Sequence, residues 1–250
     1  MSTPFSLCVL IPVFDHEHAI AAVVDAVLAH GLVIVLVDDG SSDACARKLD
    51  QLAAAWPQQI TLIRLAQNSG KGVAVQAGFT AAVQAGFSHA LQVDADGQHC
   101  TDDIPQFLAL AKQLPDAVIA GCPIYDQSVP KLRLYARYLT HIWVWINTLS
   151  LEIKDSMCGF RVYPLAAVMQ LMAQQSIGRH MNFDTDILVR LYWQGLRVIN
   201  LPTRVTYPLD GVSHFRVWMD NVLITRMHTL LFFGMLWRLP MLLKRKWHSK

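Results

Sequence analysis

The chain has few charged residues and no organised cysteines. Charged side chains make up 16% of its 250 residues, whereas about 25% is usual in soluble globular domains. The five cysteines are scattered and form no C-x-x-C pair, which argues against a disulfide framework and against a zinc site. They are expected to be reduced thiols of a cytosolic protein. The formal net charge of +2 gives no indication of a nucleic-acid partner.

Several motifs that would place the chain in other classes are also absent. No basic segment precedes the first apolar run, and Pro12 follows early, so a signal peptide is not expected. Neither G-x-x-x-x-G-K-[ST] nor a G-x-G-x-x-G after the first apolar run is present, which argues against a P-loop and against a dinucleotide-binding fold. We find no internal repeat and no obvious interdomain linker.

The sequence does contain a regular alternation of strand and helix patterns. Apolar runs typical of strands occur at 5–14, 32–39, 60–66, 89–96 and 117–121, and the first two are typical of strands buried in the sheet. Helical spacing of apolar residues occurs at 18–31, 43–56, 71–86 and 103–114. This alternation predicts an α/β fold, with a mainly parallel sheet flanked by helices.

Polar residues gather where the predicted strands end. Asp38 and Asp39 end the second run, the segment 68–72 follows the third, and Asp94 and Asp96 end the fourth. Ligands of parallel α/β sheets bind beyond the carboxyl ends of the strands. These separate segments are therefore expected to meet at one edge of the sheet, and their convergence indicates a ligand site more strongly than any one motif.

Asp94 and Asp96 are candidate metal ligands. Residues two apart in an extended strand point to the same side, and two nearby carboxylates repel each other unless a cation or a proton lies between them. Mg²⁺ or Mn²⁺ suits such oxygens and would also bind phosphate oxygens of a substrate. Gln98 and His99 are further candidate ligands. For an isolated D-x-D, a solvated turn bent at Gly97 is the more frequent structure.

The two other polar segments are candidates for binding a nucleotide. A carboxylate of Asp38 or Asp39 could accept hydrogen bonds from a base or a ribose, although a residue of 41–43 is also expected to cap the helix that follows. "NSGKG" at 68–72 enters a predicted helix. Its backbone N–H groups and Lys71 are suited to a phosphate or a sugar.

Six segments in this order resemble the family-two glycosyltransferases, which have a GT-A fold. They are "IPVFDHE", "VDDGSSD", "NSGKG", "VDADGQH", "DSMCGFRVY" and the stretch from "FDTDILVRL" to "DGVSHF", within about residues 5–215. The chain is most similar to the branch that contains dolichyl- and polyprenyl-phosphate sugar transferases. The resemblance implies a UDP- or GDP-linked sugar donor, Mg²⁺ or Mn²⁺, and inversion at the transferred sugar.

The resemblance also implies roles for individual residues. The base and ribose of the donor would contact Pro12, Phe14, Val37 and Asp39. The diphosphate and the metal would contact Asp94, Ala95, Asp96 and Gln98. The family's base-contacting Glu falls on His16, and the basic residue that relatives often carry after the fifth strand is replaced by Cys122. Positive charge beside the diphosphate would then come from Arg133, Arg137, Arg161 or His214.

Three carboxylates are candidates for a general base. A hydroxyl acceptor needs a base if it is a poor nucleophile, whereas a phosphate acceptor is already anionic. "NFDTDIL" resembles the acidic pair that supplies the base in many relatives, which favours Asp184. Its neighbour Asp186 is a further candidate. Asp155 in "DSMCGFR" is the alternative. Each could instead be a carboxylate at a helix start or in a salt bridge.

The segment 216–250 is apolar and ends in a basic stretch. It is interrupted by Asp220, Arg226, His228, Arg238 and Pro240. A spanning helix needs about 20 mostly apolar residues, and the run 229–237 is shorter. We therefore expect a catalytic domain at 1–215 and, after it, an amphipathic helix in the membrane interface that breaks or bends at the proline.

The basic end of this segment favours the cytosolic face of the inner (plasma) membrane. A second candidate for a lipid-facing surface is 141–151. The alternative is a terminal helix that packs on the domain or in a dimer interface.

The function favoured by the sequence is metal-dependent transfer of a sugar to an acceptor such as a polyprenyl phosphate or another lipid-linked group. A nucleotidyltransferase on a similar sheet would be expected to carry an N-terminal glycine-rich loop, which "IPVFDHEHAI" lacks. A non-catalytic nucleotide-sugar-binding protein would be expected to have lost the acidic residues that remain at Asp94, Asp96 and Asp184.

Overall fold

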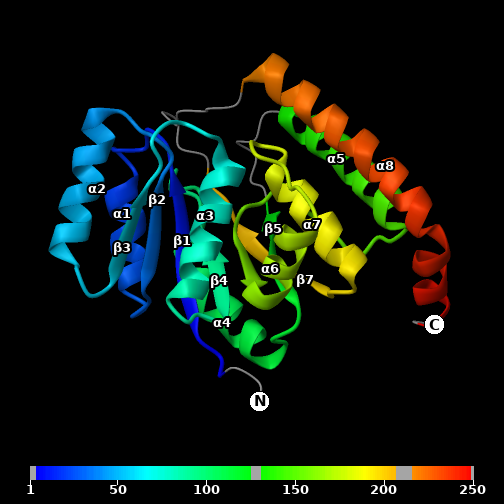
Figure 1. Ribbon diagram of the computed structural model, residues 1–250, viewed down its shortest axis with the longest axis horizontal. Helices are drawn as coiled ribbons and strands as arrows, with labels where there is room; N and C mark the ends of the chain where they lie inside the picture. Colours follow the sequence, from blue (N-terminus) through cyan, green and yellow to red (C-terminus); the bar gives the residue numbers. More distant parts are fainter. Residues whose placement is uncertain (1–3, 125–130, 207–215, 249–250) are drawn as a thin grey trace.

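A seven-stranded sheet lies at the centre of the computed structural model, which describes residues 4–124, 131–206 and 216–248 (Figure 1). The strands are β1 (Leu7–Val13), β2 (Ile34–Asp38), β3 (Ile60–Arg64), β4 (His89–Gln92), β5 (Val118–Ile124), β6 (Arg161–Pro164) and β7 (Val198–Arg204). Their order is β3-β2-β1-β4-β6-β5-β7. Among the described strands, only β6 runs antiparallel to its neighbours, which confirms the predicted mainly parallel sheet.

Helices cover both faces of this sheet. On one face lie α1 (Ile20–Leu28), α2 (Asp43–Ala55), the short turn η1 (Thr101–Asp103) and α4 (Ile104–Gln113). On the other lie α3 (Lys71–Gln84), α6 (Leu165–Gln174) and α7 (Phe183–Gln194). Side chains alternate along β1, so that Cys8 and Leu10 enter one core while Val9 and Ile11 enter the other. Burial on both faces explains why this strand is a continuous apolar run.

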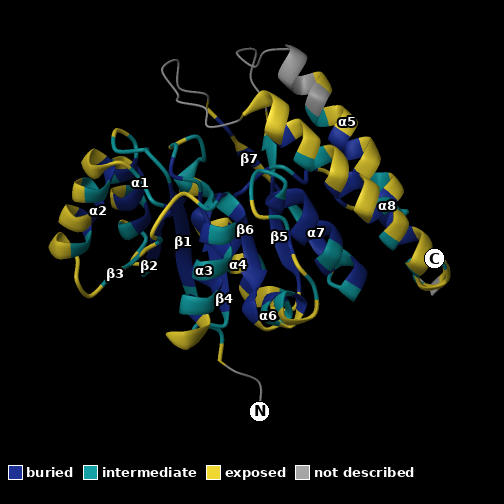
Figure 2. Cartoon of the chain, turned by 45° about the horizontal axis from the view of Figure 1, so that its top comes forward, coloured by how far each residue is buried: buried dark blue, intermediate teal, exposed yellow. Residues whose placement is uncertain are grey.

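Two long helices lie side by side outside α7: α5 (Lys131–Thr148) and α8 (Val217–His248) (Figure 1). Met227, Leu231 and Met235 of α8 are buried in the same core cluster as residues of α7. The helix therefore packs on the sheet domain along one side. Much of its remaining surface is exposed (Figure 2).

The structure corrects two of the predicted boundaries. The fourth strand ends at Gln92, so Asp94 and Asp96 lie in the following turn and not in extended backbone. α8 continues through Pro240 and changes direction near its end (Figure 1), because a proline removes one helical hydrogen bond and can bend a helix without ending it. By length and composition alone, α8 is also long and apolar enough to cross a membrane, which the short run 229–237 did not indicate.

Candidate active site

A cavity of about 870 Å³ opens at the carboxyl ends of β1 and β4. Strand order changes direction between these two strands, and such switch points are the ligand sites of open α/β sheets. The cavity is lined by Pro12, Val13, Phe14, His16, Asp39, Asn68, Gly70, Lys71, Ala74, Asp94, Ala95, Asp96, His180, Met181, Arg216, Met219 and Asp220. The polar segments that follow β1 to β4 thus meet at one edge, and the first turn of α8 completes the wall.

The predicted site residues divide into those that line the cavity and those that lie elsewhere. The lining group contains Pro12, Phe14, Asp39, Lys71, Asp94, Ala95 and Asp96. Val37 is completely buried inside β2 and belongs to the core. Gln98 does not line the cavity. Its backbone N–H donates a hydrogen bond to Asp96, and its backbone carbonyl accepts one from the N–H of Thr206. His214 lies outside the described residues.

Asp39 fastens the loop that leads into α3. Its two carboxylate oxygens accept hydrogen bonds from the N–H groups of Ser69 (2.8 Å) and Gly70 (2.9 Å). Burial raises the pKa of Asp39, and these two hydrogen bonds oppose that shift. Gly70 has a φ of +102°, and a Cβ there would lie 2.3 Å from Nδ1 of His180. The loop therefore needs glycine both for its conformation and for the approach of His180.

An ion cluster lies at the junction of α3, β4 and α7. Nζ of Lys71 is 2.8 Å from Oδ1 of Asp94 and 2.8 Å from Oδ2 of Asp184. Gln92 is completely buried and donates from Nε2 to both carboxylates, at 3.3 and 3.2 Å. Burial would lower the pKa of Lys71, but the two carboxylates outweigh it and raise that pKa. Burial would raise the pKa of Asp94, but Lys71 and then His99 outweigh it and lower that pKa.

The space around Asp94 is also shaped by "CGF" at 158–160. A Cβ at Gly159 would lie 2.5 Å from both carboxylate oxygens of Asp94, so any larger residue would displace this side chain. Nε2 of His99 is 3.4 Å from Oδ2 of Asp94, and the His99 ring stacks on Phe160. Asp94 is therefore held on one side by Lys71 and on the other by His99.

Asp184 and Arg161 lie beneath the cavity and not in its wall. Asp184 is in the first turn of α7, and its two carboxylate oxygens are taken by Lys71 and Gln92. Arg161 on β6 is completely buried, and its guanidinium donates to the backbone oxygen of Asp184 at 2.5 Å. In this arrangement Arg161 is not among the residues that line the cavity. It supports the start of α7 instead.

Asp155 belongs to a different buried cluster. Arg137 of α5 donates to its two carboxylate oxygens at 2.6 and 2.7 Å, and the N–H groups of Met157 and Cys158 donate to Oδ1 at 2.9 and 2.8 Å. Burial would raise the pKa of Asp155, but His141 and Arg137 outweigh it and lower that pKa. Asp186 pairs with Arg190 at 2.6 Å and, like Asp155, is not among the residues that line the cavity. The geometry thus favours Asp184 as the carboxylate coupled to the cavity.

Asp96 has a carboxylate oxygen available to a ligand in the cavity. Its Oδ1 accepts from the N–H of Gln98 at 3.0 Å, and its Oδ2 has no hydrogen-bond partner among the described residues. In the part of the chain that the structure describes, no three His, Cys, Asp or Glu side chains form a metal-binding group. A hard cation here would take carboxylate oxygens from Asp96 and Asp94 and further oxygens from a substrate, a donor set that fits Mg²⁺ or Mn²⁺.

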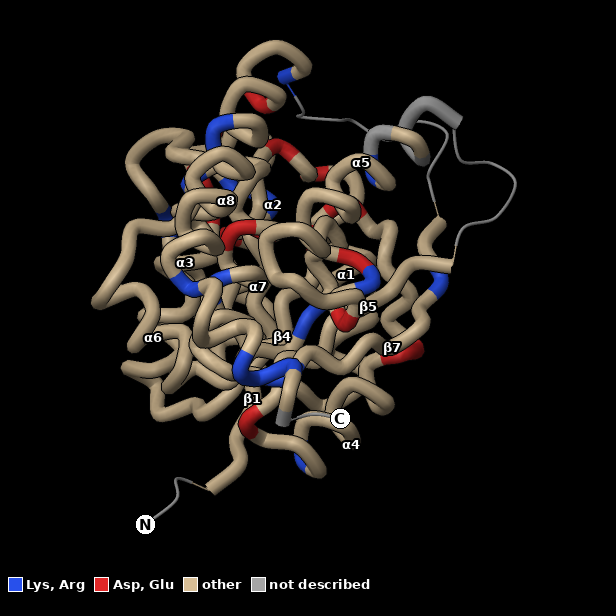
Figure 3. The backbone as a smooth tube through the Cα atoms, turned by 90° about the vertical axis from the view of Figure 1, so that its right-hand side faces the viewer, with Lys and Arg blue, Asp and Glu red and all other residues tan. Residues whose placement is uncertain are grey.

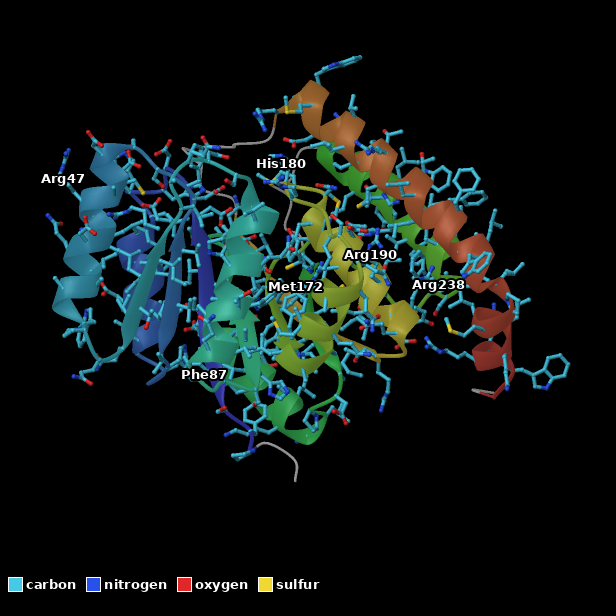
Figure 4. All side chains as sticks on the ribbon, viewed as in Figure 1. Arg47, Phe87, Met172, His180, Arg190 and Arg238 are labelled. Carbon is cyan, nitrogen blue, oxygen red and sulfur yellow. The ribbon has the colours of Figure 1, made fainter. Side chains whose placement is uncertain are left out.

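Sequence reasoning missed part of the wall. His180 has no metal-ligand spacing in the sequence, yet it lines the cavity. It lies between α3 and the start of α8 (Figure 4). Arg216, Met219 and Asp220 come from the segment assigned to a separate extension. Gln92 is not part of the wall, but its contact with the carboxylates could have been expected from the sequence. A buried amide in an otherwise apolar strand needs a polar partner.

The sequence model of the family described as "Glycosyl transferase family 2" matches residues 8–175. The chain belongs to this family. Polyprenol monophosphomannose synthase of Mycolicibacterium smegmatis is 26% identical to it over 224 residues, which are 82% of this chain and 79% of that protein. A dolichyl-phosphate beta-glucosyltransferase of Trichomonas vaginalis is 29% identical over 178 residues, 68% of this chain and 51% of that protein. An undecaprenyl-phosphate 4-deoxy-4-formamido-L-arabinose transferase of Pseudomonas fluorescens is 29% identical over 171 residues, 66% of this chain and 48% of that protein.

Solved structures confirm the predicted GT-A-like fold. Glucosyl-3-phosphoglycerate synthase from Mycobacterium tuberculosis, in complex with Mn²⁺ and UDP-glucose, superposes with a TM-score of 0.65 at 13% identity, over 93% of this chain and 79% of that one. S. aureus TarS in complex with UDP-GlcNAc superposes with a TM-score of 0.60 at 16% identity, over 91% of this chain and 66% of that one. This family-two glycosyltransferase is thus an enzyme that transfers a sugar, and it resembles the polyprenyl-phosphate branch of its family.

Proposed function

We propose that this glycosyltransferase moves a sugar from a nucleoside diphosphate to the phosphate of a membrane lipid, at the cytosolic face of the membrane. One observation carries the proposal. A single cavity is lined by Asp94, Asp96 and Lys71 and also by the first turn of α8, the helix that exposes many apolar residues. A site for an anionic leaving group therefore lies next to a surface suited to lipid. Relatives named for polyprenol, dolichyl-phosphate and undecaprenyl-phosphate support this acceptor class.

The cavity suits a sugar nucleotide in size and in charge. Its volume of about 870 Å³ is within the range of about 300–1,000 Å³ for small-molecule sites. Pro12, Phe14 and Asp39 would contact the base and ribose, Lys71 would contact the diphosphate, and Asp96 would interact with the diphosphate through the cation. A cation held by Asp96 and Asp94 would neutralise the charge that develops on the departing diphosphate. A structural relative crystallised with Mn²⁺ and UDP-glucose supports both the cation and the donor class.

The chemistry needs orientation more than proton transfer. An oxygen of the acceptor phosphate attacks C1 of the sugar, the bond from C1 to the diphosphate oxygen breaks, and a nucleoside diphosphate leaves. A single displacement of this kind inverts the configuration at C1. Because the attacking phosphate is already anionic, no base has to remove a proton. Asp184 then contributes through Lys71, which it holds at 2.8 Å.

The lipid would reach the cavity along α5 and α8. Apolar side chains more than half exposed on these two helices are Tyr135, Tyr138, Leu139, Val217, Trp218, Leu230, Phe233, Trp237, Leu243 and Trp247. Figure 3 shows α8 facing the viewer with few charged positions along it. A helix with an exposed apolar side and a basic end is typical of proteins that lie in the membrane interface.

The proposal is tested by a transfer assay in vesicles. The purified chain is mixed with UDP- or GDP-sugars and with vesicles that contain polyprenyl phosphate, with Mn²⁺ or with EDTA. We expect sugar to appear in the lipid fraction only with Mn²⁺ or Mg²⁺, and with inverted configuration at C1. Vesicles with the free polyprenol are the matched control and should accept none. Transfer to the alcohol, or to water-soluble acceptors alone, would contradict the phosphate-lipid acceptor.

A further inference from the structure

We propose that Lys71 couples the binding of the divalent cation to the binding of the donor. Its ammonium group competes with a divalent cation for Asp94, and the diphosphate of the donor offers it another anionic partner. Asp184 keeps Lys71 in place during this exchange. The inference rests on the proposed function, because it takes Asp94 and Asp96 to be beside the cation.

The geometry around Lys71 distinguishes its two carboxylate partners. The Lys71 side chain is 17% exposed and lines the cavity. Asp94 is 23% exposed and lines the same cavity, whereas Asp184 is 6% exposed and lies below it. Both ion pairs measure 2.8 Å. Lys71 therefore has one partner that a cation can reach from the cavity and one that it cannot.

Asp94 has little capacity left for an additional cation. Lys71 lies at 2.8 Å from Oδ1, Gln92 donates to the same oxygen at 3.3 Å, and His99 lies at 3.4 Å from Oδ2. A divalent cation that binds Asp94 must displace the ammonium of Lys71 or lie close to it, and two like charges at that distance repel strongly. Binding of the cation alone is thus opposed by a group of the protein itself.

A diphosphate removes this opposition. Its oxygens can accept hydrogen bonds from Lys71 and can also bind the cation, so Lys71 can give up Asp94 without losing an anionic partner. Asp184 accepts a hydrogen bond from Lys71 below the cavity, and Gln92 in turn donates to Asp184. Lys71 therefore needs only a small shift toward the cavity. Cation and nucleotide should therefore bind cooperatively, and each should raise the affinity of the other by the same factor.

Two substitutions should change the affinity for the cation in opposite directions. Lys71→Gln removes the competitor, so Mn²⁺ alone should bind about tenfold more tightly, and the cooperativity with nucleotide should fall toward none. Asp184→Asn leaves Lys71 with Asp94 as its one ionic partner in the cluster, so Mn²⁺ alone should bind more weakly. Lys71→Arg keeps the charge and should retain weak binding of Mn²⁺ alone. A merely structural role would weaken binding in both of the first two variants.

The experiment is a titration of the purified full chain with Mn²⁺. Binding is measured by calorimetry and by the electron paramagnetic resonance signal of free Mn²⁺. Each titration is repeated with saturating UDP and with saturating GDP, because the base is not assigned. Lys154→Gln is the matched control, since Lys154 is exposed and outside the cavity. Thermal unfolding verifies that every variant is folded.

The results separate this inference from the proposed function. If Lys71→Gln binds Mn²⁺ no more tightly than the unaltered chain, or keeps the full cooperativity, the inference is wrong while metal-dependent transfer stands. If Lys71→Gln does not fold, Asp184→Asn decides. Weaker binding of Mn²⁺ alone that recovers with saturating UDP or GDP upholds the inference, whereas tighter binding, or weaker binding that nucleotide does not restore, overturns it. If no variant binds Mn²⁺ with or without nucleotide, the inference and the metal requirement of the proposed function fail together.

Discussion

The carboxylates around the cavity differ in what holds them. Asp39 is occupied by two backbone N–H groups, Asp94 by Lys71 and His99, and Asp184 by Lys71 and Gln92. Asp96 accepts one described hydrogen bond and lines the cavity with an oxygen to spare. Similar residue types therefore carry different functions, and their partners decide which carboxylate fastens a loop, positions a lysine or can accept a cation.

Substitution of Asp96 tests the role of this residue. We expect Asp96→Asn to lower metal-dependent turnover by about 10²-fold or more, because charge neutralisation by a metal accounts for several kcal/mol of transition-state stabilisation. The measurement is sugar transfer as a function of Mn²⁺ concentration. Asp102→Asn is the control, since Asp102 is an exposed carboxylate nearby in the chain. Unchanged turnover of Asp96→Asn in EDTA would rule out the metal role.

Asp184 and Asp155 are separated by a second comparison. Asp184→Asn should lower kcat by about 10²-fold while donor binding survives, a size typical of losing a positioned electrostatic contact, because Lys71 loses its deeper partner. Asp155→Asn should reduce kcat per folded molecule much less. The pH profile of kcat tells the two roles of Asp184 apart, since loss of a general base removes the acidic limb of the profile. A larger kcat loss in Asp155→Asn would reverse our assignment.

At the scale of elements, single ion pairs fix how helices sit against the sheet. Arg137 of α5 pairs with Asp155, and Asp155 also accepts two backbone N–H groups of the turn before β6. Arg161 of β6 in turn donates to the backbone of α7 at Asp184. These contacts connect α5, β6 and α7 below the cavity. The position of Asp184 thus depends on packing between segments distant in sequence.

The stability provided by Asp155 should depend on pH. Its pKa is lowered in the folded chain, with His141 and Arg137 outweighing burial, so its contribution is complete above the ordinary Asp pKa of about 3.9 and is lost as pH falls through the folded value. Asp155→Asn should reduce the free energy of unfolding by about 3 kcal/mol at pH 7, because it leaves Arg137 without its carboxylate partner. Urea unfolding at pH 7, 5 and 3.5 should show this difference shrinking below about pH 4.

Asp25→Asn is the control for this series, since Asp25 is exposed on α1. It should change the free energy of unfolding little at any of the three pH values. A difference between Asp155→Asn and the unaltered chain that stays constant from pH 7 to 3.5 would contradict the ion-pair explanation.

Elements with continuous apolar runs were predictable, whereas contacts between distant elements were not. The strands β1 to β5 are evident in the sequence as apolar runs, and burial on both faces leaves few polar residues in β1 and β2 in particular. β6 is only the four residues Arg161–Pro164, and a short segment that starts with arginine has no strand pattern to detect. Lys71 and Asp184 are 113 positions apart, and only the packing of α3 against α7 brings them together.

At the scale of the whole molecule, the same helix, α8, carries the proposed membrane-binding surface and forms part of the cavity wall. Its first turn supplies Met219 and Asp220 to the cavity wall, next to Arg216 just before the helix, and its middle supplies buried residues to the core. A chain that ends at Phe215 would therefore lose part of the cavity and expose the core. Truncation cannot separate membrane binding from folding, whereas substitution of exposed residues can.

Substitution of exposed apolar residues on α8 should release the protein from membranes. Phe233 and Trp237 are 64% and 86% exposed, and burial of a large apolar side chain in an apolar environment provides about 1.5–3 kcal/mol. Replacing both with Ser should therefore lower the affinity for anionic vesicles at least about tenfold, while nucleotide binding and thermal unfolding remain unchanged. Added salt should weaken the rest of the binding, because each basic residue near an anionic surface provides about 1 kcal/mol. Co-sedimentation with vesicles at low and high salt measures both effects.

Trp56→Ser is the matched control for this change, since Trp56 is 41% exposed and lies at the end of α2, on the other face of the sheet from α8. It should leave vesicle binding unchanged, which would show that the loss belongs to the α8 surface and not to exposed aromatics in general. If the unaltered chain stays in the supernatant at low salt, without detergent and with anionic vesicles present, membrane binding by α8 is wrong. The exposed apolar residues of α5 and α8 would then be expected to pair two copies of the chain, and Phe233→Ser with Trp237→Ser would convert a dimer to a monomer in sedimentation analysis.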